Sequence, residues 1–210
     1  MDHLNRLHDL FRQFPGIGPR QSKRFVYFLL GASDAYRKML AKEILEIASH
    51  VTICSSCYRY FDNKGLEKHT CAVCADTTRD SEALMIVAKD VDLEAFEKSK
   101  AYKGFYFVLG NTLSLTERDP ESKIRTKELV FAIESRAKSG LKEVILALSL
   151  NSEGENTREF IESYISPLVK MHSLKVSILG RGLSTGTELE YSDAETIKNA
   201  LLGRRQETLM

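Results

Sequence analysis

The run "CSSCYRYFDNKGLEKHTCAVC" (residues 54–74) holds all four cysteines of the chain and separates two different sequence patterns. Cys54 pairs with Cys57 and Cys71 with Cys74 in two Cys-x2-Cys motifs, with thirteen residues between the motifs. Each motif can form a tight turn whose two thiolates point the same way, and two such turns complete a tetrahedron suited to zinc. Because four thiolates leave no open coordination position, we expect one structural Zn²⁺ ion here.

Other states of this cysteine cluster stay open from the sequence. The turns could carry thiols or disulfides without metal, or they could hold an iron–sulfur centre. His69 lies two residues before Cys71 and could compete as a ligand. Clustered cysteines in a chain without a secretion signal favour metal over disulfides, because a reducing cytosol keeps thiols free.

The overall composition restricts the class of protein without naming a function. The chain has 210 residues and a net charge of +1, so any basic surface must be local. No run approaches the roughly 18 apolar residues needed to cross a bilayer, and the N-terminal segment has no signal-peptide pattern. We therefore expect a cytoplasmic protein without a membrane segment.

Before the cysteine run, apolar residues recur at helical spacing. They predict an amphipathic helix from about Leu4 to Phe14, a second helix over residues 21–30 and a third over about 35–51. The residues predicted on the buried side of the third helix are Met39, Leu40, Ile44, Leu45, Ile47 and Ala48. Residues 1–53 should therefore form a small helical unit.

After the cysteine run, short apolar segments alternate with helical ones. The predicted strands are 84–88, 105–109, 143–150 and 175–179, and the predicted helices lie near 92–100, 124–139 and 155–171. Apolar strands separated by helices predict a parallel sheet covered on both faces. Ser192 with Glu195 makes a capping-box pattern that predicts a last short helix. The predicted fold class is therefore α/β, preceded by the helical unit and the cysteine module and followed by a C-terminal strand and helix.

The stretch "FPGIGPRQSKRF" (residues 14–25) places two glycines and two prolines among three cationic side chains. A Walker A nucleotide loop needs a second glycine five residues after the first, and Gln21 stands there instead. A helix-hairpin-helix turn fits better, because its glycines allow positive φ and close approach of a phosphate. The amides and dipole of the following helix would then face that phosphate.

This turn predicts sequence-independent binding of a DNA backbone. The alternative is a plain helix connector whose basic residues form a solvated face. The residues expected to contact DNA are Gly16, Gly18, Arg20, Lys23 and Arg24.

The order of these parts resembles that of the bacterial RecR recombination mediators over essentially the whole chain. The stretches that carry the resemblance are "CAVCADTTRD" (71–80), "YKGFYFVLGNTLSL" (102–115), "EVILALSLNSEGENT" (143–157) and "GRGLSTGTELEYSDAETIKNALLGRR" (180–205). The resemblance implies four parts. They are a helix-hairpin-helix DNA-binding unit (1–53), a four-cysteine zinc module (54–79), a Toprim domain (80–175) and a C-terminal Walker B-like segment with a helix (176–210).

A Toprim domain is the fold that primases and topoisomerases also use. Its catalytic members hold Mg²⁺ with a Glu at the end of the first strand and an Asp-x-Asp at the end of a later strand. This chain has Ala88 and Lys89 at the first place, and Ser149 and Asn151 at the second. Because these side chains do not supply the missing negative charge, we expect a protein that is not an enzyme.

Acidic residues nevertheless remain near these strand ends. Asp90 and Asp92 could act as unconventional Mg²⁺ ligands in an active Toprim enzyme, which is the alternative function. The resemblance makes Glu153 and Glu155 candidates for contact with a protein partner. Favourable charge at the start of a helix explains all four equally well.

The resemblance also implies the partners and the mode of action. They are DNA, the RecO and RecF proteins, and further copies of the chain in a ring, usually a tetramer, joined through N-terminal helices and C-terminal segments. Such a ring would be a nucleoid-associated clamp that helps load recombinase during DNA repair, and a scaffold that binds only proteins is a third possibility. The segment "GLSTGTELEYSD" (182–193) has no Walker A partner, so we expect it to have a structural or subunit-interface role, with nucleotide binding as the alternative.

Overall fold

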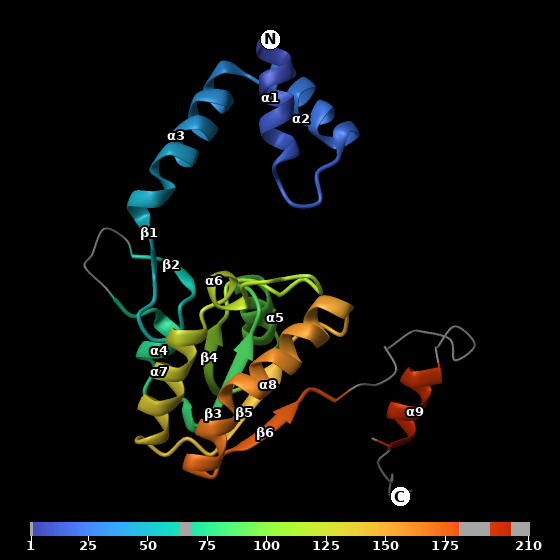
Figure 1. Ribbon diagram of the computed structural model, residues 1–210. Helices are drawn as coiled ribbons and strands as arrows, with labels where there is room; N and C mark the ends of the chain where they lie inside the picture. Colours follow the sequence, from blue (N-terminus) through green and yellow to red (C-terminus); the bar gives the residue numbers. More distant parts are fainter. Residues whose placement is uncertain (1, 64–68, 181–193, 203–210) are drawn as a thin grey trace, which may run out of the picture. The chain divides into compact units, whose positions relative to one another are not determined.

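The structure is a computed structural model that describes residues 2–63, 69–180 and 194–202. The chain divides into two compact units, Met1–Thr52 with Asp62–Leu66, and Ile53–Phe61 with Glu67–Met210 (Figure 1). The boundary between the units crosses a short two-stranded ribbon of β1 (Val51–Ile53) and β2 (Tyr60–Asp62). No helix in the described ranges is long and apolar enough to span a membrane.

The first unit consists of three helices, α1 (His3–Arg12), α2 (Pro19–Gly31) and α3 (Asp34–His50). Asp2 caps α1 by accepting a hydrogen bond from the Asn5 amide (2.8 Å), and Ser33 caps α3 through the Tyr36 amide (3.2 Å). These caps start the helices close to where the apolar periodicity predicts them.

The prediction of a buried side on α3 is wrong for the single chain. No residue of α3 is buried, and the exposed fractions of Leu45 and Ile44 are 82% and 62%. Among the described residues of the first unit, the buried ones are Ser22 and Val26 of α2. The periodicity of α3 does create an apolar face, but the described residues of this unit offer no second layer to cover it.

The second unit is built on a four-stranded parallel sheet with strand order β4-β3-β5-β6 (Figure 1). The strands are β3 (Asp80–Val87), β4 (Gly104–Val108), β5 (Glu143–Ala147) and β6 (Lys175–Ile178). At the centre of the sheet, Val87 of β3 pairs with Val108 on one side and with Ala147 on the other. The predicted parallel sheet is confirmed, although β5 ends three residues earlier than its apolar run.

Helices cover both faces of this sheet. On one face α7 (Thr126–Ala137) and α8 (Ser152–His172) pack against the strands, and on the other α5 (Asp90–Ser99) contributes the buried Leu93. Two short helices, α4 (Ala72–Ala75) and α6 (Pro120–Lys123), lie in connections, and α9 (Ala194–Leu202) follows near the C-terminus. The first face holds the larger core, which includes Leu84, Ile86, Phe107, Leu129, Ile133, Val144, Leu146, Ile161 and Ile165.

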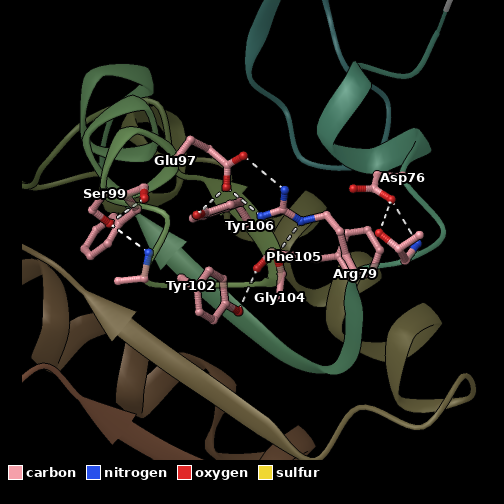
Figure 2. Close-up of polar contacts among 11 residues, drawn as sticks. Asp76, Arg79, Glu97, Ser99, Tyr102, Gly104, Phe105 and Tyr106 are labelled. Carbon is pink, nitrogen blue, oxygen red and sulfur yellow. Dashed lines mark hydrogen bonds and ion pairs between the residues drawn. The ribbon is translucent and has the colours of Figure 1, made fainter.

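A polar cluster joins the segment after Cys74 to the sheet and to α5 (Figure 2). The guanidinium of Arg79 donates two hydrogen bonds to the Glu97 carboxylate (2.6 and 3.0 Å) and a third to the Gly104 carbonyl (2.9 Å). The Tyr106 hydroxyl donates to the same carboxylate (2.7 Å). The hydrogen bonds from Arg79 hold the pKa of Glu97 below its usual value.

Candidate metal centre and nucleic-acid interface

The two glycines between α1 and α2 shape the turn in different ways. Gly16 has φ +77°, in the left-handed region that favours glycine, and the Ile17 amide closes the turn by donating to the Phe14 carbonyl (3.1 Å). Gly18 is extended (φ −85°, ψ 177°) and forms the N-cap of α2, so Gly16 alone uses positive φ. A Cβ added at either glycine would meet nothing within 4 Å, so the backbone of this turn is open.

Three cations follow the turn on the exposed side of α2. Arg20, Lys23 and Arg24 have no ion-pair partner in the described part of the chain, and Arg24 donates to the Gln21 side-chain oxygen (3.2 Å). Pro19 has no N–H, and Gly18 has no side chain to cap α2, so the amides of Arg20 and Gln21 are the ones left available at this helix start. The helix dipole adds partial positive charge at the same place. The structure therefore brings the predicted DNA-contacting residues together at one helix start.

The four cysteine sulfurs form one cluster in the second unit. All four Sγ atoms lie within 4.8 Å of one another, and those of Cys57 and Cys71 are 3.6 Å apart. Zn–S bonds of about 2.3 Å in a tetrahedron place sulfurs about 3.8 Å apart, whereas a disulfide requires about 2.05 Å. The four thiols therefore fit one metal ion. His69 does not belong to the cluster, although its carbonyl accepts a hydrogen bond from the Ser55 amide (2.8 Å).

The surroundings of the thiols also suit a cation. Cys54 and Cys57 are fully buried, and the backbone amide of Cys71 donates to the Cys54 sulfur (3.4 Å). The neighbouring thiols, Cys57 first among them, lower the pKa of Cys54, and the same closeness to Cys54 raises the pKa of Cys57, because a protonated thiol stabilises an adjacent thiolate. Thiolate is the form that binds metal, so an ion here would displace the remaining thiol protons.

The first cysteine turn is attached to the edge strand of the sheet by its backbone. The Val108 amide of β4 donates to the Cys57 carbonyl (2.8 Å). Arg125 Nη1 donates to the carbonyls of Tyr58 (2.8 Å) and Val108 (2.9 Å). Tyr58 has φ +62°, and its ring packs against that of Phe107 with centroids 5.3 Å apart. The geometry of the cysteine cluster is thus tied to the end of β4.

The carboxyl end of β3 is where a catalytic Toprim enzyme would hold its first metal ligand. Ala88 is buried there, and Lys89 is the N-cap of α5. The Asp90 carboxylate accepts a hydrogen bond from the Tyr60 amide (2.7 Å), and the Asp92 carboxylate accepts one from the Lys89 amide (2.9 Å). Both acids therefore bind backbone groups of this unit.

The acids near the end of β5 also have partners. The Asn151 side chain caps α8 by accepting from the Gly154 amide (2.9 Å). Glu153 accepts from the Thr112 hydroxyl (3.0 Å), and Glu155 pairs with Arg158 (2.6 Å). Within the described residues, the cysteines are the only group of three or more potential metal ligands close enough to share an ion. The structure does not assemble such a group from the acids at this edge of the sheet.

Comparison with known proteins agrees with this architecture. Residues 82–180 match the family profile described as Toprim domain, and residues 182–205 match the one described as RecR, C-terminal. Recombination protein RecR of Bifidobacterium adolescentis is 36% identical over 204 residues, which cover 96% of this chain and 95% of that protein. The chain belongs to the RecR family. Recombination protein RecR of Chlorobium chlorochromatii is 34% identical over 201 residues (96% and 95%), and that of Staphylococcus saprophyticus 33% over 203 residues (97% and 96%).

Membership of the RecR family makes the α/β domain a Toprim domain and supports a role in recombination repair. The RecR C-terminal match begins in the Walker B-like segment 182–193, which lies outside the described residues, as does Ser192 of the capping-box pattern. The predicted last helix is present as α9.

The sequence patterns missed the residues that fasten the cysteine module to the sheet. Arg125 and Arg136 lie in an ordinary helical segment, and nothing in their spacing indicates contact with residues 56–58.

Proposed function

We propose that this RecR family member is a non-enzymatic DNA-binding clamp that acts in recombinational DNA repair and aids recombinase loading with RecO and RecF. The observation that carries the proposal is the open turn at Gly16, which is followed by three exposed cations at the uncapped start of α2. Amides at a helix start, a favourable dipole and nearby cations bind phosphate without reading bases.

A clamp needs several such turns acting together. One cationic patch neutralises few phosphates, so a single copy would bind weakly and lose affinity steeply with salt. Several linked patches bind more strongly, because each later contact forms at high effective concentration. The helical unit supports self-association into a ring, for which we propose a tetramer, since Leu45 and other apolar side chains of α3 are uncovered in the single chain.

The side chains at the carboxyl ends of the sheet strands support the proposal that the protein is not an enzyme. Mg²⁺ requires several convergent hard oxygen ligands. Asp90 and Asp92 could have replaced the missing Glu and Asp-x-Asp ligands. Their carboxylates instead accept hydrogen bonds from the amides of Tyr60 and Lys89. A nuclease or polymerising centre at this edge therefore lacks its ligand set among the described residues.

The remaining parts of the proposal rest on the same features. We assign the ion of the cysteine cluster as one structural Zn²⁺ held by Cys54, Cys57, Cys71 and Cys74, because four thiolates leave it no reactive position. The exposed start of α8 with Glu153 and Glu155 is the proposed contact for RecO or RecF. The boundaries 1–53, 54–79, 80–175 and 176–210 stay predictions, as do the cytoplasmic location and the nucleoid association.

The DNA contact is tested by reversing charge at the turn. We expect Lys23→Glu with Arg24→Glu to weaken binding of single- and double-stranded DNA by at least about a hundredfold at a fixed salt concentration, because two phosphate contacts become repulsive. The measurement is fluorescence anisotropy at several salt concentrations, with the oligomeric mass determined by light scattering.

The matched control is Lys98→Glu with Lys127→Glu, which makes the same change of charge on exposed cations of the second unit. Its DNA affinity should stay near that of the unaltered protein. An equal loss of DNA affinity in both variants would show that overall charge drives binding. It would contradict the proposal that the turn is the DNA-binding site. Magnesium-dependent cleavage of DNA that disappears in Asp90→Asn with Asp92→Asn would contradict the non-enzymatic proposal.

A further inference from the structure

A pocket of about 420 Å³ lies at the amino ends of the sheet strands, at the opposite end of the Toprim domain from the carboxyl edge. Ser81 at the start of β3 and Phe105 at the start of β4 line it, together with the last two turns of α7 and Ser56 of the cysteine module. Its volume is in the range of sites that hold small ligands. Neither the DNA-binding turn nor the acidic edge includes these residues.

Arg136 supplies the positive charge of this pocket. Its guanidinium stacks on the Phe105 ring at 4.2 Å from the ring centre, and Nη2 donates to the Ser56 hydroxyl (3.0 Å). These two contacts hold the guanidinium in one orientation. A guanidinium has five N–H donors, and the described residues use one of those of Arg136, so the others are available to an anion.

Serine hydroxyls complete the polar part of the pocket. The hydroxyls of Ser81 and Ser135 have no hydrogen-bond partner in the described ranges of the chain, and both can donate. No Asp or Glu lines the pocket. Two carboxylates flank Ser81 in sequence, and neither lines the pocket. Glu82 is paired with Lys142 (2.5 Å), and Asp80 accepts a hydrogen bond from the Glu82 amide (2.8 Å). This arrangement favours a bound oxyanion.

A flat apolar surface adjoins the anion donors. Phe131 lies one helical turn before Ser135 on α7, lines the pocket and is 66% exposed. An exposed phenyl ring beside a fixed cation matches a ligand that has an aromatic ring close to a phosphate. Stacking of a nucleobase on such a ring is favourable for every base.

We propose that this pocket binds a nucleotide unit, with its phosphate on Arg136, Ser81 and Ser135 and its base against Phe131. A free nucleotide and one nucleotide of a single strand share this chemistry. The pocket is separate from the turn at Gly16, so this proposal does not depend on the DNA clamp.

The test is isothermal titration of the full-length protein with deoxythymidine monophosphate, inorganic phosphate and thymidine. We expect the monophosphate to bind more tightly than phosphate, and thymidine to bind least. Ser135→Asp should weaken binding of the monophosphate by about tenfold or more, because it places a carboxylate where the phosphate would bind. Arg136→Gln should have the same effect, and Phe131→Ala should bring the affinity of the monophosphate down to that of phosphate.

The control variant is Lys138→Gln, which removes a cation just after α7 that does not line the pocket. It should leave binding of the monophosphate unchanged. A short oligothymidylate, titrated into the variant with both turn residues reversed, shows whether the pocket also accepts a nucleotide within a strand.

Three results would overturn the proposal. They are no heat of binding at millimolar monophosphate, unchanged affinity in Ser135→Asp, or equal loss in Lys138→Gln. Binding of an acidic peptide in place of the monophosphate would likewise overturn it and assign the pocket to a protein partner. Failure here would leave the DNA affinity of the turn variants as the separate test of the clamp.

Discussion

At the scale of single residues, Arg79 and Glu97 join the segment before β3 to α5 and β4 (Figure 2). The hydrogen bonds from Arg79 lower the pKa of Glu97, which means that the folded protein favours the ionised carboxylate. A carboxyl whose pKa is depressed on folding stabilises the protein above its unfolded pKa. That stabilisation is lost as the pH falls through the folded pKa.

We therefore predict that Glu97→Gln lowers the free energy of unfolding by about 2 kcal/mol near neutral pH, since it removes a charge-assisted pair. The difference between the two proteins should shrink as the pH falls below about 4.5, where the carboxylate of the unfolded chain begins to take up protons. Urea unfolding at a series of pH values measures this difference. Any loss of metal from the cysteine cluster at low pH would affect both proteins alike, so it would not change the difference between their free energies of unfolding.

The control for this prediction is Glu159→Gln, which removes an exposed carboxylate whose ion pair with Arg158 is 3.9 Å long. Exposed pairs of this kind contribute about 0–1 kcal/mol, so its effect should be small at every pH. A pH-independent loss in Glu97→Gln would show that shape, and not charge, explains the role of Glu97.

At the scale of elements, the start of α8 depends on the absence of a side chain at Gly154. A Cβ there would clash with the Ser149 carbonyl oxygen and lie 2.7 Å from the Ser149 carbonyl carbon. Asn151 caps the same helix start by accepting from the Gly154 amide. The loop after β5 and the first turn of α8 therefore pack backbone to backbone.

We predict that Gly154→Ala destabilises the protein by about 2 kcal/mol or more, because either the loop or the helix must shift. Thermal unfolding followed by circular dichroism measures the loss. Gly180→Ala is the control, since a Cβ at Gly180 would meet nothing within 4 Å. A Gly154→Ala protein as stable as this control would show that the loop adjusts without cost.

At the scale of the whole molecule, the cysteine cluster and the sheet depend on each other. The Val108 amide and Arg125 hold the backbone of residues 57 and 58, and Arg136 holds Ser56. The cysteine module therefore stabilises the edge of the Toprim domain through these hydrogen bonds.

We predict that removing the metal with a chelator lowers the melting temperature of the Toprim domain and exposes the edge strand. Hydrogen exchange at the Val108 amide should rise by about tenfold or more, because its acceptor is the Cys57 carbonyl. The Ile86 amide in the central strand β3 serves as the internal control, and added zinc should restore protection. Equal exchange at Val108 with and without metal would contradict the coupling.

Periodicity and motif spacing were sufficient to predict the helical unit, the cysteine cluster and the order of strands and helices. Four thiols at fixed spacing and apolar residues at period 3.6 are patterns of neighbours in sequence, so they can be read without coordinates. The RecR resemblance, carried by longer stretches, was confirmed by the relatives over nearly the full chain.

The tertiary structure alone decided which side chains meet and which surfaces stay uncovered. The pairing of Asp90 with Tyr60, and of Arg136 with Ser56, joins residues that only the folded sheet brings together. The apolar period of α3 predicted a face but not what covers it, and in the single chain Leu45 is exposed. Sequence determines local geometry through propensity and periodicity, whereas burial and partnership depend on the packing of distant segments.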